Sequence, residues 1–279
     1  MKPIFLRFPK GKDRCLTFSY DDGTKHDRRM TAMMEQAGVK ATLNLCSGWT
    51  PTETSEDGHL SVDEIGKLAK NPLFEIACHG KTHPYYNRIS ELQGFMDLAE
   101  DRLALEQYTG GMVRGAAYPY GAFDDTVIET FRKAGIVYSR ITGDSGLFTL
   151  PKNWLAWRPT CHHRNAQKYC ESFLSQPVLG SEPLLFYIWG HSHEFDTNNN
   201  WELLEQLLAT LSGKENVWYA TNIEIYEYIM AYQQIYASAD GTKLCNPTTT
   251  DLWVAVGAKW DSAGEIVMLP AGQTVSIES

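Results

Sequence analysis

The sequence lacks long hydrophobic runs and clusters of basic residues. None of its apolar stretches approaches the roughly 20 residues that a membrane-spanning helix needs. The N-terminal segment has too short an apolar run for a signal peptide. No run of five or more Lys or Arg occurs, and the formal net charge is -9. Because nucleic acids and anionic membrane surfaces select for clustered basic residues, we expect neither as a partner.

Paired cysteine spacings are also missing. Of the six cysteines, Cys15, Cys46 and Cys78 lie within or beside apolar, strand-like runs. No spacing is typical of a disulfide framework or a C-x-x-C metal site, so we expect reduced, buried thiols and a cytoplasmic protein. No glycine-rich phosphate-binding motif follows the first apolar run, so nucleotide binding has no support.

Short apolar runs rich in β-branched and aromatic residues alternate with segments of helical periodicity. Seven runs are predicted strands: residues 16–20, 41–46, 74–78, 115–118, 136–141, 184–189 and 217–220. Such alternation is typical of a parallel sheet covered by helices. About seven units predict a closed or nearly closed β/α barrel, with an open doubly wound sheet as the alternative.

Residues 237–279 have a different pattern. Three short alternating segments are separated there by Gly, Pro, Asn and Asp, with no helical partner. We therefore predict two units, a β/α barrel over residues 1–236 and a small β-rich appendage over residues 237–279. We expect the appendage to pack either on the barrel or on a second subunit, and the second arrangement would make the protein a homo-oligomer.

Polar residues follow several of the predicted strands. Asp21 and Asp22 end the first, His79 and His83 follow the third, and His191 follows the sixth. Chemistry in a parallel barrel gathers at the carboxyl ends of the strands. Two imidazoles and one carboxylate are a common ligand set for a divalent metal. One aspartate would then bind the metal, while its neighbour stays free for proton transfer.

Four ordered segments resemble the motifs of the polysaccharide deacetylases, carbohydrate esterase family 4. "TFSYDDG" resembles T-F-D-D-G, "HGKTH" resembles H-[ST]-x-x-H, "YPYG" resembles R-x-P-[YW]-G, and "FYIWGH" resembles L-x-I-x-L-H. The resemblance covers roughly residues 14–236. It implies a distorted β/α barrel, which agrees with the seven predicted strands, and a metal-dependent hydrolase that removes acetyl groups from a carbohydrate. We expect an N-acetyl rather than an O-acetyl substrate.

The same resemblance implies the role of each motif residue. Asp21 would be the catalytic base and His191 the general acid. Asp22, His79 and His83 would be the metal ligands, most often for Zn²⁺. We also expect the backbone N–H of Tyr120 or of a neighbouring residue to be a second oxyanion donor, and the rings of Tyr120, Trp154 and Trp157 to contact the sugar.

The chain departs from the family pattern at three positions. The third-motif arginine, which orients the base in the family, falls at Ala117. Arg140 is the preferred replacement, and Arg158 is the second candidate. Gly80 stands where the family has Ser or Thr, and Gly190 replaces the apolar residue before His191, which predicts a different bend in that loop.

Other interpretations remain open. A barrel of this kind also fits hydrolysis of a small amide or formamide, and a sugar-binding protein with a structural metal would need no catalysis. Two histidines and a carboxylate also serve non-haem Fe(II) oxygenases, which would give no role to Asp21 or His191. His162 and His163 either line a sugar site or are solvated loop residues.

Overall fold

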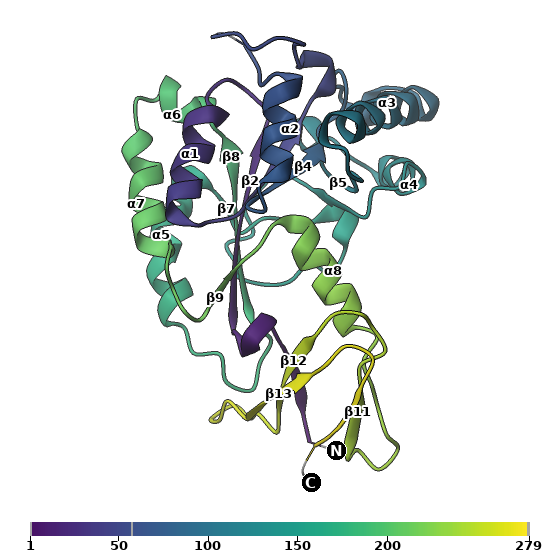
Figure 1. The fold of residues 1–279 in the computed structure, drawn as a ribbon, viewed down its shortest axis with the longest axis vertical. Coiled ribbons are helices and arrows are strands. Elements are labelled where there is room, and N and C mark those ends of the chain that lie inside the picture. The colour runs from purple at the N-terminus through teal and green to yellow at the C-terminus, as the bar shows by residue number, and fades with distance from the viewer. Residues whose placement is uncertain (1, 57, 278–279) are drawn as a thin grey trace.

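The computed structural model describes residues 2–56 and 58–277, and its central element is a sheet of eight parallel strands (Figure 1). The strands are β2 (Arg14–Asp21), β3 (Ala41–Leu45), β4 (Phe74–Cys78), β5 (Gly115–Ala117), β6 (Tyr138–Arg140), β7 (Cys161–His162), β8 (Leu184–His191) and β9 (Val217–Tyr219). Seven follow the order β6-β5-β4-β3-β2-β8-β7, and β9 pairs with β2. The sheet curls into an incomplete barrel, which confirms the predicted distorted β/α barrel.

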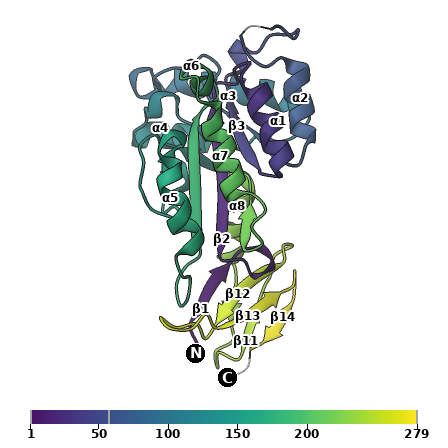
Figure 2. The same cartoon turned by 90° about the vertical axis from the view of Figure 1, so that its left-hand side faces the viewer.

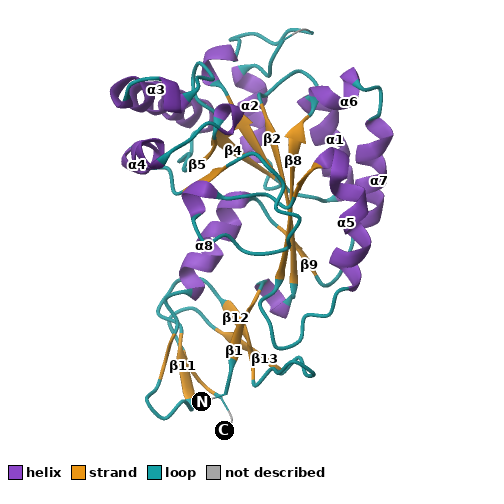
Figure 3. Ribbon diagram, turned by 180° about the vertical axis from the view of Figure 1, so that it is seen from behind, coloured by secondary structure: helices purple, strands orange, loops and turns teal. Residues whose placement is uncertain are grey.

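Helices cover the sheet (Figures 1 and 3). They are α1 (Asp27–Ala37), α2 (Val62–Lys70), α3 (Glu91–Thr109), α4 (Asp125–Lys133), α5 (His163–Ser175), α6 (His193–Thr197), α7 (Trp201–Leu211) and α8 (Asn222–Tyr232). Short 3-10 turns are η1 (Pro9–Gly11), η2 (Ser47–Trp49), η3 (Tyr86–Arg88), η4 (Pro119–Gly121) and η5 (Trp154–Ala156). All eight residues of β2 are buried, as expected for a central strand covered on both faces.

Capping motifs set where several helices begin. Ser61 accepts a hydrogen bond from the Glu64 N–H at the start of α2, and the Glu64 carboxylate accepts one from the Ser61 N–H. The same reciprocal pair at Ser90 opens α3, and Asp124 caps α4 through the Val127 N–H at 2.9 Å. These caps satisfy N–H groups that the first helical turn leaves free.

A small antiparallel β region forms the other end of the molecule (Figure 2). One sheet contains β1 (Ile4–Arg7), β12 (Leu252–Val256) and β13 (Glu265–Leu269), and the other contains β10 (Tyr236–Ala237), β11 (Lys243–Cys245) and β14 (Thr274–Ser276). The N-terminal strand β1 pairs with β12, so both ends of the chain contribute to this region. It adjoins the amino end of β2, opposite the end of the sheet to which the predicted catalytic residues belong.

The cysteines and the helices agree with two expectations from the sequence, namely reduced thiols and no apolar stretch long enough to span a membrane. All six cysteines are free thiols, and five of them are buried. Over residues 2–56 and 58–277, every helix is too short or too polar to cross a membrane.

Candidate functional site

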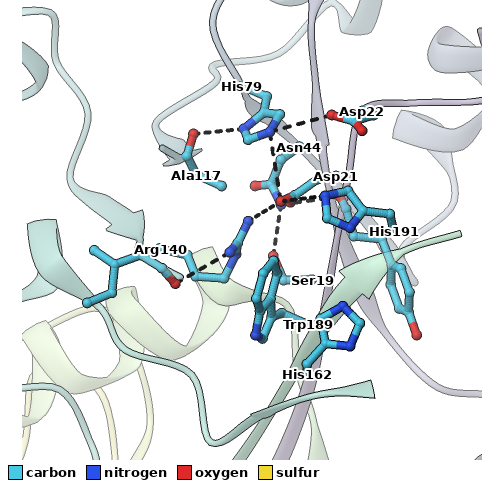
Figure 4. Close-up of polar contacts among 12 residues, drawn as sticks. Ser19, Asp21, Asp22, Asn44, His79, Ala117, Arg140, His162, Trp189 and His191 are labelled. Carbon is cyan, nitrogen blue, oxygen red and sulfur yellow. Dashed lines mark hydrogen bonds and ion pairs between the residues drawn. The ribbon is translucent and has the colours of Figure 1, made fainter. Parts of the chain in front are cut away.

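The two adjacent aspartates diverge at the end of β2 (Figure 4). Asp21 is the last residue of the strand, and Asp22 takes a left-handed backbone conformation with φ of 80°. The turn sends the Asp22 carboxylate toward the histidines that follow β4. Asp21 stays at the strand end, where its Oδ1 accepts a hydrogen bond of 2.9 Å from the side-chain amide of Asn44 on β3.

The two histidines after β4 meet Asp22. The Nε2 atoms of His79 and His83 lie 3.2 Å apart, and each lies 3.6 to 3.7 Å from Asp22 Oδ1. In a tetrahedral zinc site with bonds of roughly 2.0 to 2.1 Å, adjacent ligand atoms lie about 3.3 Å apart. These three residues therefore form a triangle of suitable size for one divalent cation.

The hydrogen bonds around this triangle favour cation binding. His79 donates its Nδ1–H to the carbonyl of Ala117 at 2.9 Å, which leaves the Nε2 lone pair facing Asp22 and His83. Asp22 Oδ1 is buried without a hydrogen-bond partner among the described residues. Burial, followed by the charge of Asp21, raises the pKa of Asp22 to about 6. An oxygen buried in this way is costly unless a cation or a donor reaches it, so the residues fit a metal ion.

Asp21 is held by an arginine from β6. Arg140 is fully buried, donates through Nη2 to Asp21 Oδ2, and places its guanidinium 4.4 Å from the centre of the Trp189 ring. Burial alone would raise the pKa of Asp21. The charge of Arg140, with smaller contributions from two histidines, outweighs burial and holds this pKa below its ordinary value. The structure thus brings Arg140 to the base, whereas Arg158 is exposed.

His191 lies at the end of β8 between two carboxylates. Its Nε2 is 3.9 Å from Asp21 Oδ2, and its Nδ1 donates to Glu194 Oε1 at 3.3 Å. Burial would lower the pKa of His191, but the hydrogen bond to Glu194 and the charges of the two aspartates outweigh it and raise the pKa. The protonated imidazole is therefore favoured, as a proton donor requires.

Glu194 was not identified from the sequence. Its Oε2 also accepts hydrogen bonds from the Nε2 atoms of His162 and His163, at 2.9 and 3.1 Å. Burial would raise the pKa of Glu194, but the hydrogen bonds from the three imidazoles hold it well below its ordinary value. A H-x-H-E pattern directly after a strand was the available signal, because it places a carboxylate one helical turn from His191.

The departure at Gly190 has a structural cause. A Cβ atom at this position would lie 2.1 Å from Nδ1 of His163. The ring of His163 fills that space and stacks on Phe195, with centroids 4.3 Å apart. Strand β8 continues through Gly190 to His191, and the glycine makes room for a neighbouring ring.

Exposed aromatic rings surround the metal-ligand triangle. Tyr120, 54% exposed, stacks on Tyr85 with centroids 3.8 Å apart and lies edge-on to His83. The Trp49 ring is 5.1 Å from His83. Asp22, His83 and Tyr120 are three of the five non-glycine residues with positive φ in the described chain. Such strained conformations concentrate at functional sites.

The two predicted sugar-binding tryptophans lie elsewhere. Trp157 is 1% exposed and packs edge-on against Tyr138 and Tyr187 in the core. Trp154 packs edge-on against Trp157 and against Tyr226 of α8. The burial of Trp157 leaves no free ring face for a sugar and corrects the prediction for that residue. Of the three aromatic residues predicted to contact substrate, Tyr120 is the one at the site.

Comparisons with known proteins point to one family. The model of the polysaccharide deacetylases matches residues 9–139, which include Asp21, Asp22, His79 and His83. No curated protein sequence matches the chain.

Three solved structures are similar to part of this chain. A polysaccharide deacetylase from Bacillus cereus is 23% identical over 50% of this chain and 44% of its own, with a TM-score of 0.44. A Streptococcus pyogenes deacetylase in complex with acetate is 18% identical over 45% and 55%, with a TM-score of 0.41. A family 4 carbohydrate esterase from Streptomyces lividans, also in complex with acetate, is 15% identical over 74% and 90%, with a TM-score of 0.45. The chain thus spans less than half of the Bacillus cereus structure.

Proposed function

We propose that the protein is a metal-dependent hydrolase that removes acetyl groups from a carbohydrate, because the model of the polysaccharide deacetylases matches residues 9–139 of this chain. One observation carries the proposal beyond the family match. Asp22, His79 and His83 converge with metal-ligand spacing beside an arginine-paired aspartate and a histidine whose pKa is raised. This arrangement combines a cation site, a base and an acid, which hydrolysis of an amide or ester uses.

Asp22, His79 and His83 would hold the cation, and two imidazoles with one carboxylate suit Zn²⁺. When bound, such an ion supplies a Lewis acid for the acetyl carbonyl and lowers the pKa of water toward about 7. Asp21 has no place in the triangle and stays available for proton transfer. Two of its neighbours, Asn44 and Arg140, fix the direction of its carboxylate.

Asp21 acts as the general base in this proposal. The charge of Arg140 keeps its carboxylate ionised, so Oδ2 accepts the proton of the attacking water. His191 then donates the Nε2 proton to the departing group, and Glu194 holds its ring through Nδ1. Since an amine leaves only when it is protonated, the raised pKa of His191 favours an N-acetyl substrate over an O-acetyl one.

The aromatic rings beside His83 suit a sugar. Tyr85 and Tyr120 present a stacked pair at the mouth of the site, and both are partly exposed. Sugar rings bind such flat apolar faces through their C–H groups while their hydroxyls remain in water. A small amide or formamide would leave this surface unused, so we favour a carbohydrate substrate.

Acetate release tests the proposal. The purified chain is incubated with N-acetylglucosamine oligomers, acetylated xylan and small amides, before and after chelation and after zinc is restored. We expect acetate from the oligomers, loss on chelation, and recovery with zinc. Turnover of small amides alone would support the amide alternative, and metal content without turnover of any substrate would support a sugar-binding protein.

A further inference from the structure

A second group of ligand-type side chains lies beside the proposed acid. One ring nitrogen of His162, one ring nitrogen of His191 and one Glu194 carboxylate oxygen all lie within 4.8 Å of one another. The closest approaches to Glu194 are 2.9 Å for His162 and 3.3 Å for His191. His163 Nε2 lies 3.1 Å from the same carboxylate. This group shares no residue with the triangle of Asp22, His79 and His83.

We propose that His162, His191 and Glu194 form a second divalent-cation site, and that a cation bound there inhibits the reaction proposed for the first. Two imidazoles and one carboxylate suit zinc and similar borderline metals better than Mg²⁺ or Ca²⁺, which prefer oxygen ligands. His163 offers a fourth nitrogen at the same carboxylate, so the group contains enough donors for tetrahedral coordination.

The surrounding packing preorganises this group. His162 and His163 are 4% and 2% exposed, and they occupy consecutive positions where β7 passes into α5. His163 is stacked between Tyr20 and Phe195, with centroids 5.8 and 4.3 Å away. Fixed ligands bind a cation with a smaller loss of side-chain entropy than mobile surface ligands do.

The inhibition follows from the atom that the cation would take. In the cation-free protein, His191 donates its Nδ1 proton to Glu194. A cation bound by His191 Nδ1 and His162 Nε2 displaces into solvent the protons that these two nitrogens donate to Glu194, and it occupies the carboxylate that holds the His191 ring. The imidazole then keeps a single proton on Nε2 and cannot act as an imidazolium acid. This step rests on the proposed function, whereas the existence of the second site does not.

Zinc stoichiometry tests the site directly. The 279-residue chain is stripped of metal and titrated with Zn²⁺, and the bound metal is counted by calorimetry and by elemental analysis. We expect two equivalents for the unmodified chain and one for His162→Gln, or a loss of more than about tenfold in second-site affinity. Glu194→Gln provides a second variant that leaves the His162 cap of α5 in place.

His193→Gln is the matched control. His193 lies 5.2 Å from the His191 ring but outside the ligand group, so this variant should still bind two equivalents. His83→Gln should lose the first equivalent and retain the second. One equivalent in the unmodified chain, or two in both His162→Gln and Glu194→Gln, would overturn the second site. The group would then serve only as a hydrogen-bonded support for His191.

Inhibition of acetate release by excess zinc distinguishes this inference from the proposed function. We expect excess Zn²⁺ to inhibit acetate release by the zinc-loaded enzyme, and His162→Gln to need more than about tenfold more zinc for half-inhibition, relative to its own uninhibited rate. Equal inhibition of both proteins would overturn the inhibitory role. If no substrate is hydrolysed, the proposed function fails, and the metal count still decides the second site.

Discussion

Asp21 Oδ2 lies 3.9 Å from Nε2 of His191 and accepts a hydrogen bond from Arg140. The proposed base and the proposed acid therefore lie next to each other, although 169 residues of the sequence lie between them. The register of β2 and β8 explains the meeting, because Asp21 is paired directly with His191 across the two parallel strands. Because the two strands run parallel, their carboxyl ends lie together, and both side chains lie at the same edge of the sheet.

Asp21→Asn should abolish most turnover without removing the metal. The amide cannot take a proton from water, and a general base contributes roughly 10²- to 10⁴-fold to a rate. Acetate release should fall by that factor, while zinc content stays equal to that of the unmodified chain because Asp22, His79 and His83 are intact. Normal activity in this variant would remove Asp21 from the mechanism, and lost zinc would show that it also supports the metal site.

Arg140→Met should move the acidic limb of the pH profile to higher pH. The guanidinium holds the pKa of Asp21 below its ordinary value, and without it burial raises that pKa. More of the carboxylate is then protonated at a given acidic pH, so the falling limb of kcat/KM begins earlier as pH is lowered. The control is Arg158→Met, which changes an exposed arginine. An acidic limb that moves equally in both variants, or in neither, would refute the pairing of Arg140 with the base.

Glu194→Gln should move the basic limb of the profile to lower pH. The Glu194 carboxylate helps to raise the pKa of His191, so its loss lowers that pKa and the proton needed for the leaving group is released earlier as pH rises. The profile of kcat/KM against pH reports this limb when it is measured with one equivalent of zinc per chain, so that the proposed second site stays empty in both proteins. A role limited to folding would reduce the rate at every pH and leave the position of the limb unchanged.

Local patterns predicted the parts of the site that lie directly at strand ends. Asp21, Asp22 and His79 follow buried apolar runs, so alternation along the chain was enough to place them at one edge of a sheet. Arg140 could be proposed for the same reason, because β6 ends at that residue. The pairing of neighbouring parallel strands brings these residues together in one site.

Other features depend on contacts that no local pattern carries. Strand β7 has two residues, too few for a periodic signal, so His162 was interpreted as a loop residue and its contact with Glu194 was missed. The pairing of β1 with β12 joins segments almost 250 residues apart, and the sequence placed only the later one in the β-rich appendage. Trp157 illustrates the same limit, since an aromatic residue in a polar segment is equally compatible with a sugar site and with the core.

Tyr85→Ala and Tyr120→Ala should weaken binding of oligomers more than binding of monomers. A sugar next to the reacting unit would stack on these rings, whereas a single N-acetylglucosamine occupies only the position at the cation. We expect KM for a tetramer to rise about 3- to 10-fold, with a smaller change for the monomer. Tyr236→Ala, which removes an exposed ring from β10, is the control. Equal changes for both substrates would argue against a sugar contact at these tyrosines.

Gly190→Ala should destabilise the protein through one identifiable clash. The new Cβ would lie 2.1 Å from Nδ1 of His163, and the ring cannot move away without losing its stacking on Phe195. Overpacking of this kind costs about 1–3 kcal/mol in the free energy of unfolding, which urea denaturation measures. Gly111→Ala is the matched control, because nothing lies within 4 Å of its Cβ, and its effect should stay within about 0.5 kcal/mol.

The double variant Gly190→Ala with His163→Ala decides whether the clash is the cause. Removing the ring opens the space that the new methyl group needs, so the second substitution should cost less in the Gly190→Ala background than in the unmodified chain. A coupling free energy of about 0.5–3 kcal/mol between the two positions would confirm direct contact. Additive effects would mean that the backbone of β8 itself needs glycine at position 190. The His163 ring would then fill the neighbouring space without being the reason for the glycine.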